Sequence, residues 1–363
     1  MEMRKRQEKK GKKKQVKFGE KSNSHISGKL KLESLTLEVH QVSNESDKQY
    51  ISEEYSILAL KNESTYLIAT DLKGMKVIKD NILVFLDALP TQDFIGGLVY
   101  VDYLDCFLLL SGEILYRKEI NNKAPSVYID LKLSAEVILG LRYSRMNKKL
   151  ITFIDYKNLA VINIDEKRLD LVFEKEIGES VRGYKIFGEQ EKKVIAITED
   201  GYVVLYVFNY EMRKLAAIGH HKIKLIKEIE ESGLSLAVSD DNDYVLVEII
   251  QNDNRFCSRM MVFQIDGLLL IQKAVFDAFS AKTQEKCCLQ SVGCFGSHVF
   301  WVGLESFERA QIYVYDIKSG HFKELEEKRV EHREEFPTDI HRIENHLYYT
   351  GGHGRIMRLT VKF

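Results

Sequence analysis

The sequence has little proline, cysteine or tryptophan. Its 363 residues include 3 Pro, 5 Cys, 1 Trp and 22 Gly, and this content excludes collagen-like and proline-rich classes. The cysteines form no CxxC pair, and no apolar signal segment is visible, so we expect reduced thiols rather than a disulfide framework. Cys287, Cys288 and Cys294 are close in sequence, but adjacent cysteines seldom bind one zinc ion, which favours places in strands or the core.

Long apolar runs and a strong charge imbalance are also missing. No uninterrupted apolar stretch approaches the ~20 residues that cross a bilayer, so we expect a soluble chain without a transmembrane segment. There are 53 basic and 54 acidic residues, and 45% of the residues are hydrophobic. This composition supplies a sizeable core and excludes wholesale disorder.

Motifs that mark enzymes or bound cofactors are lacking as well. There is no Gly-x-Ser-x-Gly elbow and no helical His-Glu-x-x-His. Gly351–Gly354 lacks the Lys-Ser/Thr ending of a phosphate loop, and Ser239–Asp243 lacks the glycine and the closing glutamate of a calcium loop. The C-terminal histidines have spacings of 9, 5 and 7 residues, which fit no metal motif: His332, His341, His346 and His353. We predict no catalytic residue, no metal and no cofactor.

Positive charge concentrates at the N-terminus. Residues 1–18 carry nine basic and two acidic residues, a net charge of +7, which leaves −8 for the remaining 345 residues. This composition is typical of a nuclear or nucleolar address, or of a tail that binds RNA or anionic lipid. A solubilising leader is the alternative. We expect residues 1–29 to form a disordered basic arm, and five lysines to carry the polyanion contact or nuclear address: Lys9, Lys10, Lys12, Lys13 and Lys14.

The rest of the chain repeats a hairpin pattern. Val194–Thr198 and Tyr202–Val207 flank an Asp-Gly turn, which is a strong hairpin signal, and similar hairpins recur elsewhere. A strand before and after each hairpin gives four-stranded units, whose first strands fall near Ser56, Gly96, Val137, Arg182, Gly233, Leu289 and Thr338. Their spacings of 40 to 56 residues are close to the ~40 to 50 residues of a propeller blade.

The two ends of this pattern complement each other. The unit near Thr338 has three expected strands, whereas Leu35–Val42 is an orphan strand with alternating apolar and polar residues. Pairing them would close a ring and remove its exposed edges. We therefore predict an all-β fold, a seven-bladed β-propeller formed by residues 30–363 as a single domain, in which the N-terminal strand completes the last blade.

Three segments depart from the regular pattern. Gln251–Arg255 and Phe276–Lys286 are predicted as protruding loops or a short helix, and Glu305–Arg309 as an insertion. Loops on a rigid ring often carry binding residues, although simple length variation is the alternative. The 18 Tyr and 18 Phe could stack single-stranded RNA, but their alternation in strands favours core and cross-strand contacts.

The hairpins resemble those of the WD-repeat propeller family. Asp200–Tyr206 is similar to the family's Asp-Gly-x-ϕ-x-ϕ-Trp pattern, with tyrosine in place of tryptophan, and Ile312–Asp316 is similar to the strand end that carries Trp-Asp. Gly354–Leu359 follows the same hairpin pattern. The sequence departs from the family in having no Trp-Asp dipeptide, and Trp301 is its one tryptophan. The resemblance covers residues 35–363 and implies a ring that recognises peptides or proteins.

These features favour a non-enzymatic scaffold that binds protein partners in a multi-subunit complex. The basic arm would address it to the nucleus or nucleolus, or contact RNA, within a nuclear ribonucleoprotein or ribosome-assembly complex; a cytoplasmic location is the alternative. Two rival functions stay open. One is a propeller enzyme with its active site in the channel. The other is a phosphoinositide-binding propeller, which is disfavoured because the expected Arg-Arg pair is absent.

Overall fold

The computed structural model describes most of the chain after the basic arm. The described residues are 36–41, 56–62, 64–70, 74–80, 82–87, 95–121, 124–131, 138–155, 158–171, 180–198, 201–209, 216–224, 234–252, 256–277, 288–296, 298–306, 309–325, 340–343, 346–350 and 356–362. The five lysines of the arm and the segment Gly351–Gly354 lie outside them.

The described strands form four-stranded antiparallel sheets that follow one another along the chain. Sheet 1 contains β2 (Ser56–Asn62), β3 (Thr65–Thr70), β4 (Gly74–Lys79) and β5 (Ile82–Asp87). Sheet 2 contains β6 (Ile95–Val101), β7 (Cys106–Ser111), β8 (Ile114–Glu119) and β9 (Ser126–Asp130). Sheet 3 contains β10 (Ile138–Ser144), β11 (Lys149–Ile154), β12 (Asn158–Asn163) and β13 (Arg168–Leu171).

Three further sheets repeat this order. Sheet 4 contains β14 (Val181–Phe187), β15 (Lys193–Thr198), β16 (Tyr202–Asn209) and β17 (Ala216–Lys224). Sheet 5 contains β18 (Leu234–Val238), β19 (Tyr244–Asn252), β20 (Phe256–Asp266) and β21 (Leu269–Asp277). Sheet 6 contains β22 (Cys288–Phe295), β23 (His298–Ser306), β24 (Arg309–Asp316) and β25 (His321–Leu325).

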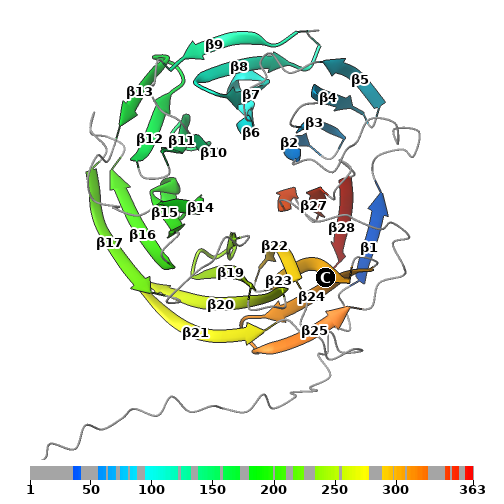
Figure 1. Cartoon of the computed structure of the whole chain (residues 1–363), viewed down its shortest axis with the longest axis vertical. Helices are drawn as coiled ribbons and strands as arrows, with labels where there is room; N and C mark the ends of the chain where they lie inside the picture. Colours follow the sequence, from blue (N-terminus) through cyan, green and yellow to red (C-terminus); the bar gives the residue numbers. More distant parts are fainter. Residues whose placement is uncertain are drawn as a thin grey trace, which may run out of the picture.

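The last sheet combines strands from both ends of the described chain. Sheet 7 has the order β1 (Thr36–Gln41), β28 (Ile356–Lys362), β27 (His346–Thr350) and β26 (Ile340–Ile343). β1 pairs antiparallel with β28, with Thr36 opposite Lys362 and Gln41 opposite Met357. Figure 1 shows the sheets arranged around a common axis, with β2, β6, β10, β14 and β22 near the axis and β5, β9, β13, β17, β21, β25 and β1 outermost.

Sheets 1 to 5 bury both of their faces against neighbouring sheets in the part of the chain that the structure describes. All six residues of β7 are buried. Phe107 and Leu109 pack in a cluster shared with sheet 1, whereas Leu108 and Leu110 pack in a cluster shared with sheet 3. Because successive side chains of a strand point to opposite faces, this strand reads as a continuous apolar run rather than an alternating one. The core is therefore a series of apolar layers between sheets.

Sheet 1 also contacts the last sheet. Leu58, Tyr66 and Ile68 of sheet 1 form one buried cluster with Tyr348 of β27. Tyr66 and Tyr348 are among the largest side chains that are fully buried in the described part of the chain. The first and the last sheets along the chain are thus neighbours that share a core.

The predicted all-β class is confirmed, and the hairpins lie where the sequence indicates. In each sheet the strand predicted to come first begins within two residues of its expected position, from β2 at Ser56 to β26 at Ile340. The Asp-Gly hairpin joins β15 to β16, and Gly201 adopts φ of 78°. Glycine meets this left-handed conformation without the steric cost of a Cβ atom.

The prediction of loops or a short helix in sheets 5 and 6 was wrong at several residues. Gln251–Asn252 pairs with β20, Phe276–Asp277 belongs to β21, and Glu305–Ser306 belongs to β23. Part of the extra length of the fifth unit lies in longer strands, since β20 has 11 residues. Among the described residues, the structure contains no helix that is long and apolar enough to cross a membrane.

Candidate functional site

The connections between the first and second strands of successive sheets touch one another, and we call the edge that they form the rim. Each of four connections contains a residue in the left-handed region: Asp105 (φ 46°), Lys148 (φ 51°), Gln190 (φ 55°) and Asn242 (φ 61°). Asp and Asn visit this region more readily than other residues with a side chain. The repeated conformation produces a sharp turn at the same place in neighbouring sheets.

Hydrogen bonds and ion pairs connect these turns from one sheet to the next. They span the five junctions from sheet 1 to sheet 6, and each joins a residue at the end of one first strand or its connection to the corresponding place in the following sheet. In chain order they are Lys61 with Asp105 (2.6 Å), Asp102 with Arg145 (2.8 Å), Ser144 with Glu191 (2.7 Å), Gly188 with Asn242 (3.1 Å) and Asp240 with Gly296 (2.6 Å). The rim is therefore fixed to the rigid sheets beneath it.

At the junction between sheets 2 and 3, several polar contacts of the rim meet at Asp102. The short helix η2 (Asp102–Leu104) connects β6 to β7, and Asp102 accepts hydrogen bonds from the backbone of Tyr103 (2.8 Å) and from the hydroxyl of Tyr143 (2.9 Å). Arg145 forms an ion pair with the other oxygen of the same carboxylate at 2.8 Å. One carboxylate thus holds the connection of sheet 2 against the first strand and first connection of sheet 3.

Two tyrosines of sheet 2 hold the turn between the last two strands of sheet 3. The Tyr103 hydroxyl donates to Asp165 at 3.0 Å, and the Tyr128 hydroxyl donates to the backbone carbonyl of Ile164 at 3.3 Å. Below these contacts lies the apolar cluster between the two sheets, to which Tyr128 and Tyr143 also contribute. The tyrosines therefore span the boundary between the core and the polar rim.

Two lysines of sheet 3 lie over the rings of these same tyrosines. The Lys148 ammonium is 5.2 Å from the centre of the Tyr103 ring, and the Lys167 ammonium is 4.7 Å from the centre of the Tyr128 ring. Both distances are within the range of a cation–π contact, worth about 0.5–1 kcal/mol at an exposed site. Both lysines are exposed and adopt left-handed φ values, 51° and 48°. The two cations are thus held in defined places on the surface.

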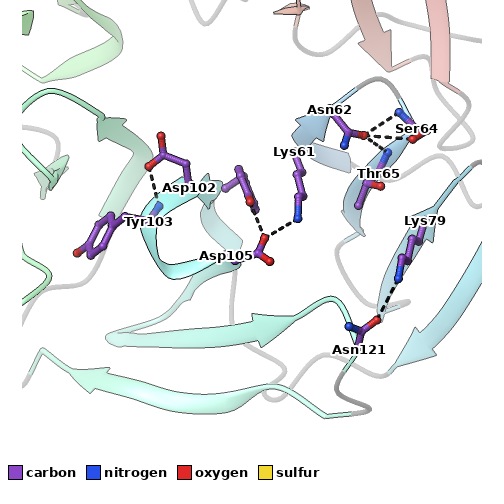
Figure 2. A network of polar contacts seen from close by, with 10 residues as sticks. Lys61, Asn62, Ser64, Thr65, Lys79, Asp102, Tyr103, Asp105 and Asn121 are labelled. Atoms are coloured by element: carbon purple, nitrogen blue, oxygen red, sulfur yellow. Dashed lines mark hydrogen bonds and ion pairs between the residues drawn. The ribbon is translucent and has the colours of Figure 1, made fainter.

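A second group at the rim joins sheets 1 and 2, as Figure 2 shows. Asp105 receives hydrogen bonds from the Lys61 ammonium and from the Tyr100 hydroxyl, both at 2.6 Å. The hydrogen bond from Lys61 has the largest effect and lowers the pKa of the Asp105 carboxyl, and the hydrogen bond from Tyr100 lowers it further. Asp105 is accordingly a carboxylate at neutral pH.

The tyrosines of the rim remain protonated donors. Burial raises the pKa of three of them well above the ordinary value, and the hydrogen bond that each donates to an aspartate adds to the shift: Tyr100, Tyr103 and Tyr143. Burial also raises the pKa of Tyr128. These phenols can hold the rim together but are poor candidates for proton transfer near neutral pH.

The outer layer of the sheet 2 and sheet 3 junction exposes side chains that are common in protein interfaces. Met146 is 67% exposed, Tyr103 is 36% exposed, and the Arg145 side chain is 72% exposed. Met, Tyr and Arg are enriched at protein–protein interfaces, and Tyr and Arg are frequent hot spots. We call the set Tyr103, Arg145, Met146, Lys148 and Lys167 the rim patch.

The histidines, the cysteines and the acidic turn Ser239–Asp243 do not form a metal site or a reactive nucleophile among the described residues. In the part of the chain that the structure describes, no three His, Cys, Asp or Glu side chains gather as metal ligands do. His346 contacts the ring of Tyr348, and Cys106 and Cys294 are buried thiols that form no disulfide bond. Ser239–Asp243 forms the turn between β18 and β19, as predicted, closed by backbone and Ser239 hydrogen bonds. Burial raises the pKa of the Cys106 thiol to about 11, so this thiol is not a reactive nucleophile.

No local pattern in the sequence predicted the rim patch. Its members come from three short turns that look like ordinary polar connections between strands. A signal was present in the one tyrosine and two aspartates of Asp102–Asp105, because a connection that carries both a large aromatic residue and two carboxylates exceeds what a tight turn needs. The pairing of this segment with Arg145 and Asp165 depends on the arrangement of the sheets and is not visible in the sequence.

Comparison with solved structures places the architecture among known folds, although no protein-family model matches the chain and no curated protein matches it in sequence. The β-propeller domain of Cps50 (Swd1) from Myceliophteria thermophila has a TM-score of 0.59 at 12% identity, covering 86% of this chain and 97% of that one. The WD40 β-propeller domain of Doa1 has a TM-score of 0.57 at 10% identity, covering 85% and 93%. Catalytically inactive virginiamycin B lyase from Staphylococcus aureus, solved with quinupristin, has a TM-score of 0.63 at 8% identity, covering 90% and 99%.

These similarities show that the chain has a β-propeller fold. They confirm, at the level of the fold, the resemblance to WD-repeat propellers that the hairpin motifs indicate, since one of the structures is the WD40 propeller domain of Doa1. The third is an enzyme. The same fold therefore accompanies different activities, and the function of this chain has to be argued from its own surface.

Proposed function

We propose that this chain is a non-enzymatic interaction platform: a single propeller domain of seven blades, formed by residues 30–363 and closed by β1, that holds protein partners on its rim. The observation that carries the proposal is the rim patch, an exposed group of Tyr, Arg, Met and Lys side chains fixed by hydrogen bonds between sheets 2 and 3. A surface that is ordered before binding loses little conformational entropy when a partner docks.

The role of β1 in this proposal follows from its pairing. β1 is hydrogen-bonded to β28, so the sheet that contains the last described strands is completed by the first one. Sheet 1 packs on the same sheet through Tyr66 and Tyr348. Such an arrangement supports a closed ring whose loops keep fixed positions relative to each other.

The rim also supports binding rather than catalysis. Its carboxylates already accept hydrogen bonds from the chain itself: Asp102 from Tyr143, Asp105 from Lys61 and Tyr100. These hydrogen bonds fix the carboxylates and their donors in place, which suits a surface that docks a partner.

The finer part of the proposal concerns the cell compartment and the complex. The +7 charge of residues 1–18 beside a body of net charge −8 suits an address or tether that is separate from the binding surface. We place the protein in the nucleus or nucleolus, as a subunit of a ribonucleoprotein or ribosome-assembly complex, with RNA contact through Lys9, Lys10, Lys12, Lys13 and Lys14.

Quantitative affinity purification with mass spectrometry tests the proposal. The tagged chain, expressed in its own cells, should retain a reproducible set of proteins, and nuclease treatment should release only those held through RNA. A variant with the five lysines of the arm changed to Gln should keep its nuclease-resistant partners but lose nuclear accumulation. Recovery of no specific protein under either condition would contradict the platform, whereas unchanged localisation and RNA association of the arm variant would remove only the nuclear assignment.

A further inference from the structure

The sheet 2 and sheet 3 junction presents two cations whose described partners are aromatic rings. Lys148 and Lys167 come from different turns of sheet 3, and their ammonium groups lie over Tyr103 and Tyr128. The described contacts of both ammonium groups are with rings and not with carboxylates. Each group can therefore accept an anion without giving up an ion pair.

The neighbouring carboxylates are already engaged. Asp165 accepts the Tyr103 hydroxyl and Asp102 accepts Tyr143 and Arg145. The nearby carboxylate Glu166 pairs with Arg168 at 3.0 Å. The local acidic groups thus orient the tyrosines and arginines, while the two lysines remain available at the surface.

From this arrangement we propose that the rim patch binds an acidic, extended peptide segment of a partner protein, with its carboxylates on Lys148 and Lys167 and an apolar side chain against Met146. This inference rests on the proposed function and specifies its partner. The rings of Tyr103 and Tyr128 hold the two ammonium groups in place. The two lysine side chains therefore lose little conformational entropy when a peptide with suitably spaced carboxylates binds them. Met146, which is 67% exposed and lies two residues before Lys148 in the same turn, supplies an adaptable apolar contact.

The charges at the rim patch disfavour two other ligands, the basic arm of the chain and RNA. The basic arm of the chain itself carries +7 over residues 1–18 and would be repelled by these lysines. RNA would need a continuous track of cations for its evenly spaced phosphates, whereas the rim patch contributes three cations, and one of them, Arg145, is already paired with Asp102. A lysine ammonium also lies over one face of each of the Tyr103 and Tyr128 rings, which leaves these rings less open to stacking with bases.

The test uses the full-length chain and a random dodecapeptide library displayed on phage. Peptides selected on the immobilised protein are synthesised, and their affinities are measured by fluorescence anisotropy for the wild type, for Lys148→Gln/Lys167→Gln, and for the matched control Lys273→Gln/Lys318→Gln. The control lysines are exposed and lie in sheets 5 and 6. A Lys148→Arg/Lys167→Arg variant keeps both charges, and urea unfolding checks that all variants are folded.

We expect the selected peptides to be acidic and to bind the Lys148→Gln/Lys167→Gln variant about fivefold or more weakly, which is the loss of two surface ion pairs. The control variant should bind as the wild type does, and the arginine variant should restore binding. Selection of no peptide, selection of peptides without acidic residues, or equal binding by the two glutamine variants would overturn the inference. Tighter binding of a uridine dodecamer that is lost in Lys148→Gln/Lys167→Gln would assign the patch to RNA instead.

The same variants separate this inference from the proposed function. If affinity purification recovers specific partners and Lys148→Gln/Lys167→Gln keeps all of them, the platform stands and the rim patch is not its acidic-peptide site. If neither the wild type nor the variant retains a specific partner, the platform itself fails.

Discussion

The close approach of the inner strands β6 and β10 makes Gly97 the most informative position for the packing of the ring. A Cβ atom at Gly97 would lie 2.4 Å from the Cβ of Leu141 and 2.4 Å from its backbone nitrogen. Neither atom can rotate away, because the position of each is set by the backbone. Changing Gly97 to Ala therefore forces the two strands apart by about 1 Å before ordinary contact is restored.

The size of this effect follows from two opposing contributions. Gly→Ala stabilises a protein by about 0.4–1 kcal/mol where the backbone tolerates it, because it restricts the unfolded chain. Inserting a methyl group into a packed core costs about 1–3 kcal/mol, and contact with backbone atoms on the other strand favours the upper end. We expect a net loss of about 2 kcal/mol for Gly97→Ala. With a urea m value of about 3 kcal/mol/M, the unfolding midpoint should fall by about 0.7 M.

Urea unfolding with two probes measures this loss. Far-ultraviolet circular dichroism reports on all sheets, and the fluorescence of Trp301, the one tryptophan, reports on β23 in sheet 6. Both probes should shift together if the ring unfolds as one unit. Gly267→Ala is the control, since its Cβ would meet nothing within 4 Å and only its φ of 61° adds strain, about 1 kcal/mol. A Gly97→Ala midpoint at or above that of the control would refute the packing described for β6 and β10.

Three further outcomes are expected. Tyr184→Phe removes a hydroxyl that donates to the carbonyl of Ile151 at 2.6 Å, and thermal or urea unfolding should show a loss of about 1–2 kcal/mol; wild-type stability would mean that water replaces the hydroxyl. Asp105→Asn should lower stability at pH 7, and the difference from the wild type should shrink as the pH falls through the folded pKa, because a carboxyl whose pKa is lowered on folding stabilises the protein above its unfolded pKa near 4 and loses that effect below its folded pKa; a difference in urea midpoint that stays constant as the pH is lowered would contradict the ion pair. Deleting residues 30–42, which include β1, should abolish soluble, cooperatively unfolding protein, whereas deleting residues 1–18 should leave the melting temperature nearly unchanged; equal effects would contradict the pairing of β1 with β28.

The repeated four-stranded units could be predicted from the sequence because several local features of the sequence indicate the same strands and turns. The Asp200-Gly201 turn, the β-branched runs on each side of it and the spacing of similar hairpins all indicate four-stranded units. The strand from Leu35 to Val42 was predicted as the outer strand of the last sheet. In the structure, β1 (Thr36–Gln41) lies at the edge of that sheet, next to β28. Strand ends were less predictable in sheet 5, because β19 continues through polar residues such as Gln251, which pairs with Cys257 of β20.

The candidate site could not be predicted in the same way. Tyr103 and Lys148 are 45 residues apart, and nothing local requires them to meet. Their contact depends on the placement of sheet 2 beside sheet 3, which the apolar cluster around Leu108 and Leu150 fixes. The predicted nuclear-address lysines of the arm lie outside the described residues, so their role stays a prediction.

Site-specific photo-cross-linking in cells tests most directly whether partners dock on the rim. A benzophenone amino acid is introduced at Met146, which is 67% exposed in the rim patch, or at Leu269, which is 51% exposed in β21 of sheet 5 and serves as the control. Irradiation of the full-length protein, followed by denaturing purification, should give a discrete adduct with a partner from Met146 and none from Leu269. An adduct from Leu269 alone, or no adduct at Met146 while partners still co-purify, would contradict the rim as the binding surface.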